Sequence, residues 1–108
     1  MVQNSELMRG IAETVILKLL SERTMYGYEI IKLVNERTNG EFQWKEGTLY
    51  PCLHRLEEAG LIASSWELSS GKPRKYYSLT KQGESAVPEK VGETRRFCAA
   101  LGALLANA

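Results

Sequence analysis

The sequence predicts one small, mainly α-helical domain that carries a single β-hairpin. Apolar residues recur at helical spacing over most of the chain, and between about residues 61 and 79 the period changes to that of extended strands. A chain of 108 residues has room for one modest hydrophobic core and not for two. We therefore expect the order helix, helix, helix, hairpin, helix.

The first half of the chain contains the pattern of three helices. The first is expected over residues 5–20, where apolar side chains form a broad stripe. The second is expected over 26–37 and is stopped by Asn39-Gly40. The third is expected over 46–59, and Gly60 stands where a left-handed C-terminal cap is favoured.

The hairpin is expected directly after the third helix. Residues 61–67 form its first strand, 69–73 its turn and 74–79 its returning strand. Because an isolated two-stranded hairpin is marginal in water, its apolar side should pack on the helices. Trp44 and Trp66 are accordingly predicted to lie in the core or at a hinge.

A last helix should follow the hairpin, with Thr80 as its N-terminal cap and Lys81 as its first residue. Pro88 lies within this segment, lacks a backbone donor and clashes with the preceding turn. We expect a kink or a restart of the helix there.

Composition excludes several functional classes. No apolar run approaches the roughly 18 residues of a membrane helix, and no export signal is recognisable, so a cytoplasmic protein is expected. The two cysteines are not in a CxxC spacing and His54 is the single histidine. We therefore predict no metal site, no cofactor and no catalytic residues, and the protein is not expected to be an enzyme.

The net charge of +1 conceals a local basic cluster. Residues 69–83 carry four basic side chains and no acidic one, namely Lys72, Arg74, Lys75 and Lys81. Because exposed charges are screened over about 8 Å at physiological salt, a phosphate backbone would respond to this cluster more than to the distant total.

The expected order of elements is that of a winged helix-turn-helix domain, and several clusters closely resemble the PadR family of bacterial transcriptional regulators. They lie within residues 11–84 and are Tyr26-Gly27-Tyr28-Glu29-Ile30, Glu46-Gly47-Thr48-Leu49-Tyr50-Pro51, Leu53, Arg55-Leu56-Glu57, Gly60-Leu61-Ile62, Arg74-Lys75-Tyr76-Tyr77, Leu79-Thr80 and Gly83. The resemblance implies a dimeric repressor of operator DNA whose last helix dimerises. In some members a small aromatic or drug-like effector relieves repression.

The residues themselves also indicate a DNA-binding surface. If Leu49, Leu53 and Leu56 are buried, a rotation of about 100° per residue turns the opposite side of the third helix outward, and small residues there allow close approach to a groove. The basic wing can reach the adjacent backbone. The predicted contacts within the double-stranded operator are made by Lys45, Gly47, Thr48, Tyr50, Pro51, His54, Arg55, Lys72, Arg74 and Lys75.

The last helix carries a second apolar pattern. Val87, Val91, Thr94, Cys98, Leu101 and Leu105 follow one another at steps of 4, 3, 4, 3 and 4. This seam could fold back on the first helix of its own chain, or it could pair with the first and last helices of a second copy. We expect the homodimer, because two-fold symmetry presents two recognition helices to successive major grooves. Its predicted contacts are Leu7, Ile11, Val91, Thr94, Phe97, Cys98, Leu101 and Leu105.

The two expected units are a winged helix-turn-helix domain over residues 1–80 and a dimerisation helix over 81–108. An aromatic effector held between tryptophans of the last helix does not fit, because that segment has none; Met8, Ile11, Val15 and Phe97 would line a small apolar pocket instead. The alternative function is a winged-helix protein-interaction module whose basic wing is incidental.

Overall fold

The structure is a computed structural model, and it describes residues 5–106; residues 1–4 and 107–108 of the two expected units lie outside the described part. Four helices and a three-stranded antiparallel sheet make up this part, which confirms the mainly helical fold with a hairpin. The elements in chain order are α1 (Ser5–Leu20), β1 (Met25–Tyr26), α2 (Gly27–Arg37), α3 (Glu46–Glu58), β2 (Ile62–Ser69), β3 (Lys72–Leu79) and α4 (Lys81–Leu105).

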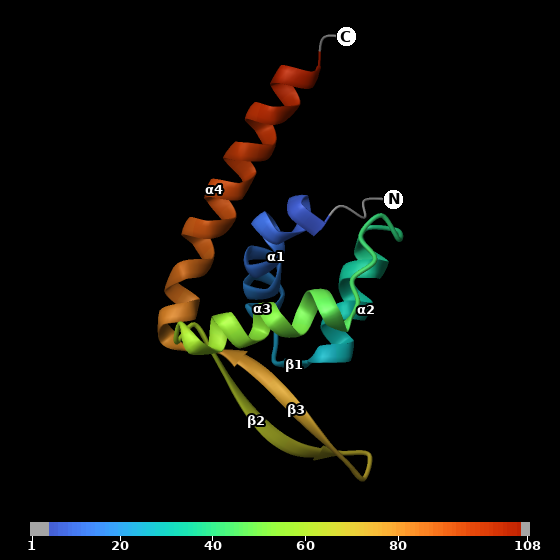
Figure 1. The fold of residues 1–108 in the computed structure, drawn as a ribbon. Coiled ribbons are helices and arrows are strands. Elements are labelled where there is room, and N and C mark those ends of the chain that lie inside the picture. The colour runs from blue at the N-terminus through green and yellow to red at the C-terminus, as the bar shows by residue number, and fades with distance from the viewer. Residues whose placement is uncertain (1–4, 107–108) are drawn as a thin grey trace.

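Helices α1, α2 and α3 form the body of the molecule (Figure 1). The β2–β3 hairpin extends from one side of this body, and α4 projects from the other side. The ends of the first three helices agree with the sequence pattern within one residue. Gly60 has φ +78° after α3, as the predicted left-handed cap requires.

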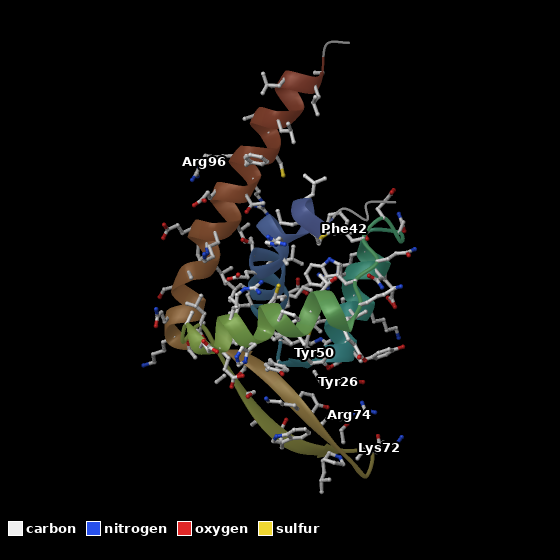
Figure 2. All side chains as sticks on the ribbon, in the orientation of Figure 1. Tyr26, Phe42, Tyr50, Lys72, Arg74 and Arg96 are labelled. Atoms are coloured by element: carbon white, nitrogen blue, oxygen red, sulfur yellow. The ribbon has the colours of Figure 1, made fainter. Side chains whose placement is uncertain are left out.

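The last helix is continuous from Lys81 to Leu105, so the expected restart at Pro88 is wrong. A proline removes one backbone hydrogen bond, but the preceding part of α4 is already held by its cap and by packing. Thr80 Oγ1 accepts a hydrogen bond from the Gly83 amide at 3.1 Å. Val87 packs against the buried core. From Phe97 onward every described side chain is exposed, and Arg96 points away from α1 (Figure 2).

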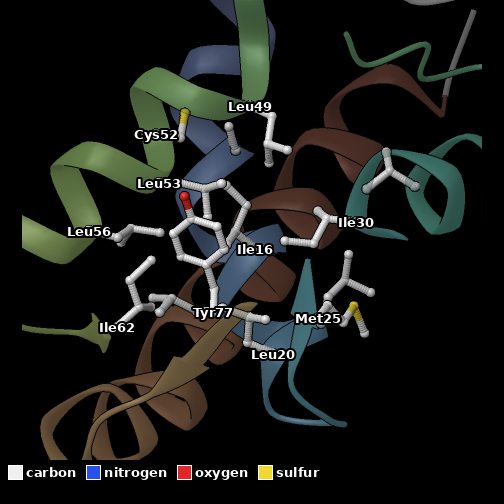
Figure 3. Packing of buried hydrophobic residues seen from close by; sticks show 14 of the residues in the cluster. Ile16, Leu20, Met25, Ile30, Leu49, Cys52, Leu53, Leu56, Ile62 and Tyr77 are labelled. Atoms are coloured by element: carbon white, nitrogen blue, oxygen red, sulfur yellow. The ribbon is translucent and has the colours of Figure 1, made fainter. Parts of the chain in front are cut away.

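The buried core lies between the three body helices and the base of the sheet (Figure 3). The ring of Tyr77 reaches in from β3 and lies among Leu53, Leu56 and Ile62. Trp44 is 2% exposed and belongs to this core, as predicted. Trp66 is 68% exposed, so its predicted burial is wrong. The reason is that β2 continues beyond the helices and carries Trp66 out with it.

The sheet contains a strand that the sequence pattern did not indicate. The two-residue strand β1 pairs with β3, with Met25 opposite Tyr77 and Tyr26 opposite Tyr76, and the order is β1-β3-β2. The expected hairpin is present, but β1 joins it at its base, so the sheet has three strands instead of the two expected. A strand of two residues is too short to display an alternating period.

The turn of the hairpin is also shorter than expected. Only Ser70 and Gly71 separate the strands, and both have positive φ, at 53° and 79°. Two left-handed residues are typical of a type I′ turn, whose twist matches that of the flanking strands. Ser69 and Lys72 consequently pair with each other instead of lying in the loop.

Candidate nucleic-acid interface

The outward side of α3 is open to solvent. Leu49, Cys52, Leu53 and Leu56 are buried, which confirms the predicted inner face. Gly47, Pro51 and His54 are exposed and form a ridge along the opposite side. A Cβ atom added to Gly47 would meet nothing within 4 Å. The first turn of this ridge therefore presents little more than backbone.

The N-terminus of α3 lacks a capping side chain. Lys45 is the N-cap residue in an extended conformation, and its side chain makes no cap hydrogen bond. The first amides of a helix have no partner within the helix, and the macrodipole gives this end a partial positive charge. The exposed ammonium of Lys45 adds to that charge, and the exposed carboxylate of Glu46 in the first turn opposes it. An anion such as a phosphate is the natural complement of this end of the helix.

His54 on the ridge and Arg55 beside it both have acidic partners. His54 Nε2 lies 2.6 Å from Glu58 Oε1. Arg55 Nε donates to Glu13 Oε2 of α1 at 3.2 Å, and its Nη2 lies 3.1 Å from Cys52 Sγ. Burial raises the pKa of the Cys52 thiol above its ordinary value.

Arg55 and Thr48 lie on the side of α3 that faces α1. A groove of about 270 Å³ separates the two helices there, and its lining is Met8, Arg9, Ala12, Gly47, Thr48, Pro51, Cys52 and Arg55. The ten predicted DNA contacts are thus not all equally placed. Arg55 is hydrogen-bonded to Glu13 of α1, whereas Gly47 and Pro51 are exposed at the edge of this groove.

Tyr50 lies on the other side of α3, toward α2. Its side chain is 44% exposed, and its hydroxyl packs directly on Gly27, the first residue of α2. A Cβ at Gly27 would overlap this hydroxyl and the ring. The glycine therefore permits close contact between the start of α2 and the middle of α3.

The basic residues of the hairpin are divided between its two faces. Alternation along β3 places Lys72 and Arg74 on one face and Lys75 on the other. The Arg74 guanidinium lies 4.5 Å from the centre of the Tyr26 ring, and this ring meets Tyr76 edge-on at 5.4 Å. Figure 2 shows Lys72 farther out, near the turn. The basic residues that are neighbours in the sequence therefore do not form a single basic patch on the sheet.

The predicted dimer residues fall into two groups. Val91 and Thr94 line a groove of about 250 Å³ against α1 of the same chain, together with Thr14, Val15, Lys18, Leu19 and Arg95. Beyond this groove the seam of α4 is exposed, at Phe97, Cys98, Leu101 and Leu105. In α1, Leu7 is exposed and Ile11 is half-buried. The fold-back on α1 therefore accounts for Val91 and Thr94, and the later residues of the seam are left exposed.

The prediction of the interface missed the exposed apolar residues of β2. Trp66 and Leu68 are 68% and 78% exposed. Strand alternation places them on one face with Ser64, and the sequence shows this alternation.

Over residues 5–106 no group of acidic, histidine and cysteine side chains could hold a metal ion. The helices of this part include none that is long and apolar enough to cross a membrane.

The pair α2–α3 followed by the β2–β3 wing defines a winged helix-turn-helix protein. Residues 16–89 match the transcriptional regulator PadR-like family, and the chain belongs to this family. Its members are transcriptional regulators and not enzymes.

Two solved structures and one sequence relative illustrate the relationship. A transcriptional regulator from Clostridium thermocellum superposes with a TM-score of 0.83 at 34% identity, over 93% of this chain and 98% of that one. A PadR family transcription regulator from Clostridium difficile gives 0.76 at 39% identity, over 88% and 98%. The transcriptional regulator YqjI of Escherichia coli is 38% identical over 80 residues, which are 74% of this chain and 37% of that protein.

Proposed function

We propose that this regulator is a homodimeric repressor that binds operator DNA, with α3 in the major groove and the wing on the adjacent backbone. The observation that carries the proposal is the bare N-terminal ridge of α3, where Gly47 leaves the backbone open and Lys45 adds a positive charge. A helix can approach base edges only where its side chains leave room. The bound dimer represses transcription by covering promoter DNA. Because a bacterial promoter lies in the cytoplasm, the protein acts there.

The dimer is supported by the apolar seam of α4. Phe97 is 66% exposed, and Leu101, Leu104 and Leu105 continue its side of the helix into solvent. A contiguous exposed apolar surface on a small domain marks an interaction site. We assign residues 1–80 to DNA binding and 81–108 to pairing. A small aromatic or drug-like effector would fit the mainly apolar groove between α1 and α4 and would act on this pairing.

Salt dependence tests the proposal against the protein-interaction module. Binding should be measured by anisotropy on a duplex from the promoter of its own gene and on a random duplex, between about 50 and 200 mM salt. We expect Lys75→Ala to weaken binding to both duplexes and to reduce the logarithmic salt slope by about 0.9 for each lost phosphate contact. Thr48→Ala should mainly reduce the preference for the promoter duplex. Identical effects of the two substitutions on both duplexes would contradict these roles, and no binding by the unmodified protein would support the interaction module.

Gly47→Ala should separate stability from binding. The new methyl group meets no neighbour within 4 Å, and replacing a helical glycine by alanine stabilises a protein by about 0.5–1 kcal/mol. On the DNA, however, this methyl group lies between α3 and the groove. We expect a higher melting temperature together with weaker operator binding, and a stronger loss for Gly47→Leu.

Gly92→Ala is the matched control, because its Cβ meets only the flexible end of Arg96 at 3.5 Å. It should stabilise the helix and leave operator affinity unchanged. If Gly47→Leu binds the operator as well as the unmodified protein, the ridge does not face DNA.

A further inference from the structure

The Arg55 guanidinium is held by two neighbours. Its Nε donates to Glu13 Oε2 of α1 at 3.2 Å, and its Nη2 donates to Cys52 Sγ of α3 at 3.1 Å. A guanidinium carries five N–H donors, so these two hydrogen bonds leave three. Among residues 5–106 the three have no hydrogen-bond partner. Arg55 therefore combines a fixed side chain with donors that are free to bind a ligand.

Arg55 borders the same groove as the open first turn of α3. It lines the groove of about 270 Å³ between α1 and α3 together with Gly47, Thr48 and Pro51. Thr48 and Arg55 are seven residues apart, which is close to two full helical turns, so both lie on one side of α3. A duplex that contacts this side at its first turn therefore passes Arg55 two turns farther along.

The ion pair of Arg55 with Glu13 adds little to stability by itself. The two side chains are 49% and 39% exposed, and a pair so open to solvent gains little over its separate hydrated ions. What Glu13 does fix is the orientation of the guanidinium. Its own place is rigid, because the adjacent Ala12 is 1% exposed and anchors this turn of α1 in the core.

We propose that Glu13 is a positioning residue: it orients Arg55 toward the edge of a guanine in the major groove, and so gives α1 a part in operator specificity. This inference rests on the proposed function. Arginine pairs with guanine through two directed hydrogen bonds to O6 and N7, which require a guanidinium of fixed orientation. A phosphate contact depends on charge instead, and the Glu13 carboxylate offsets the charge of Arg55 and repels a phosphate. The arrangement therefore favours a base over the backbone.

Three variants separate orientation from charge. The quantity measured is the promoter preference, the ratio of the affinities for the promoter duplex and the random duplex in anisotropy titrations. We expect Arg55→Ala to lower it on the order of tenfold, the scale of one bidentate base contact. Glu13→Ala should cause most of this loss and strengthen binding to the random duplex, because the guanidinium keeps its charge without the opposing carboxylate. Glu13→Gln keeps an oxygen that accepts from Nε, so it should retain the preference and strengthen binding to both duplexes.

A double variant, a modified base and a control complete the test. Glu13→Ala/Arg55→Ala should have the promoter preference of Arg55→Ala alone, because Glu13 acts through Arg55. We expect one promoter guanine at which 7-deazaguanine, which lacks the N7 acceptor, weakens binding by the unmodified protein but not by Arg55→Ala. Glu22→Ala is the matched control. Both Glu22 carboxylate oxygens accept from Arg37 at 2.8 Å, away from the groove, so its loss should leave the preference unchanged.

Other results would overturn the inference. If Glu13→Ala weakens binding to both duplexes equally, the ion pair only ties α1 to α3. If Glu13→Ala still lowers the preference when residue 55 is already alanine, Glu13 does not act through Arg55. If Arg55→Ala weakens binding to both duplexes equally and flattens the salt slope, Arg55 contacts a phosphate, and the proposed function stands. If the unmodified protein binds no duplex, the proposed function itself fails.

Discussion

The Leu101→Asp substitution is expected to dissociate the proposed dimer and to weaken operator binding by about 10²–10⁴-fold, the range that is lost when two linked sites act separately. Leu101 lies in the seam of α4 together with Phe97 and Leu105. A carboxylate placed there would be buried without a partner in the dimer, and an unpaired buried charge costs several kcal/mol. The monomer keeps its own core, because every side chain of α4 from Phe97 onward is exposed in it.

Ala103→Asp is the matched control, since position 103 is about 200° around the helix from Leu101 and bears an exposed side chain. It introduces the same charge in the same part of α4 and should leave the dimer intact. Sedimentation analysis gives the oligomeric state, and anisotropy with the promoter duplex gives the affinity. A dimeric Leu101→Asp protein, or a monomer with full operator affinity, would refute the proposed arrangement.

Gly83→Ala should have the largest effect on folding, with a loss of about 3 kcal/mol in the free energy of unfolding, at the upper end of overpacking penalties. Gly83 is buried in the first turn of α4. A Cβ atom there would overlap the carbonyl oxygen of Leu61, which belongs to the backbone and cannot rotate away. That carbonyl accepts the amide of Thr80 at 3.1 Å, so a shift would also disturb the start of α4.

Urea unfolding followed by circular dichroism measures this loss. Gly92→Ala makes the same chemical change in the same helix where there is room, and it should be neutral or stabilising. If Gly83→Ala unfolds at the same urea concentration as the unmodified protein, α4 can move away from Leu61 without cost, and its junction with the wing is not tightly packed.

Long periodic segments of this fold could be predicted from the sequence. The stripe of α1 and the leucines of α3 extend over several turns, so their period is clear, and Gly60 and Thr80 mark ends by local chemistry. Strand β1 has two residues and forms only because β3 lies beside it. No local pattern encodes such a tertiary pairing. Pro88 argues for a break, but the packing and capping of α4 outweigh its local cost.

The candidate interface could be predicted in part. The inner and outer faces of α3 follow from its leucines, and the outward position of Gly47 follows with them. The ion pair of Arg55 with Glu13 joins residues far apart in sequence, and no spacing rule anticipates it. The expectation that Trp66 lies in the core or at a hinge follows from the usual burial of large aromatic residues. Trp66 is exposed because β2 extends beyond the three body helices, and how far it extends depends on how those helices pack.

The contact of the Tyr50 hydroxyl with Gly27 has a consequence for regulation. It fixes the angle between α2 and α3, and the pairing of β1 with β3 ties the wing to the start of α2 in the same way. We therefore expect α2, α3 and the wing to move together as one rigid unit. In the proposed dimer, we expect an effector to alter the separation and tilt of the two units, while the shape of each unit stays constant.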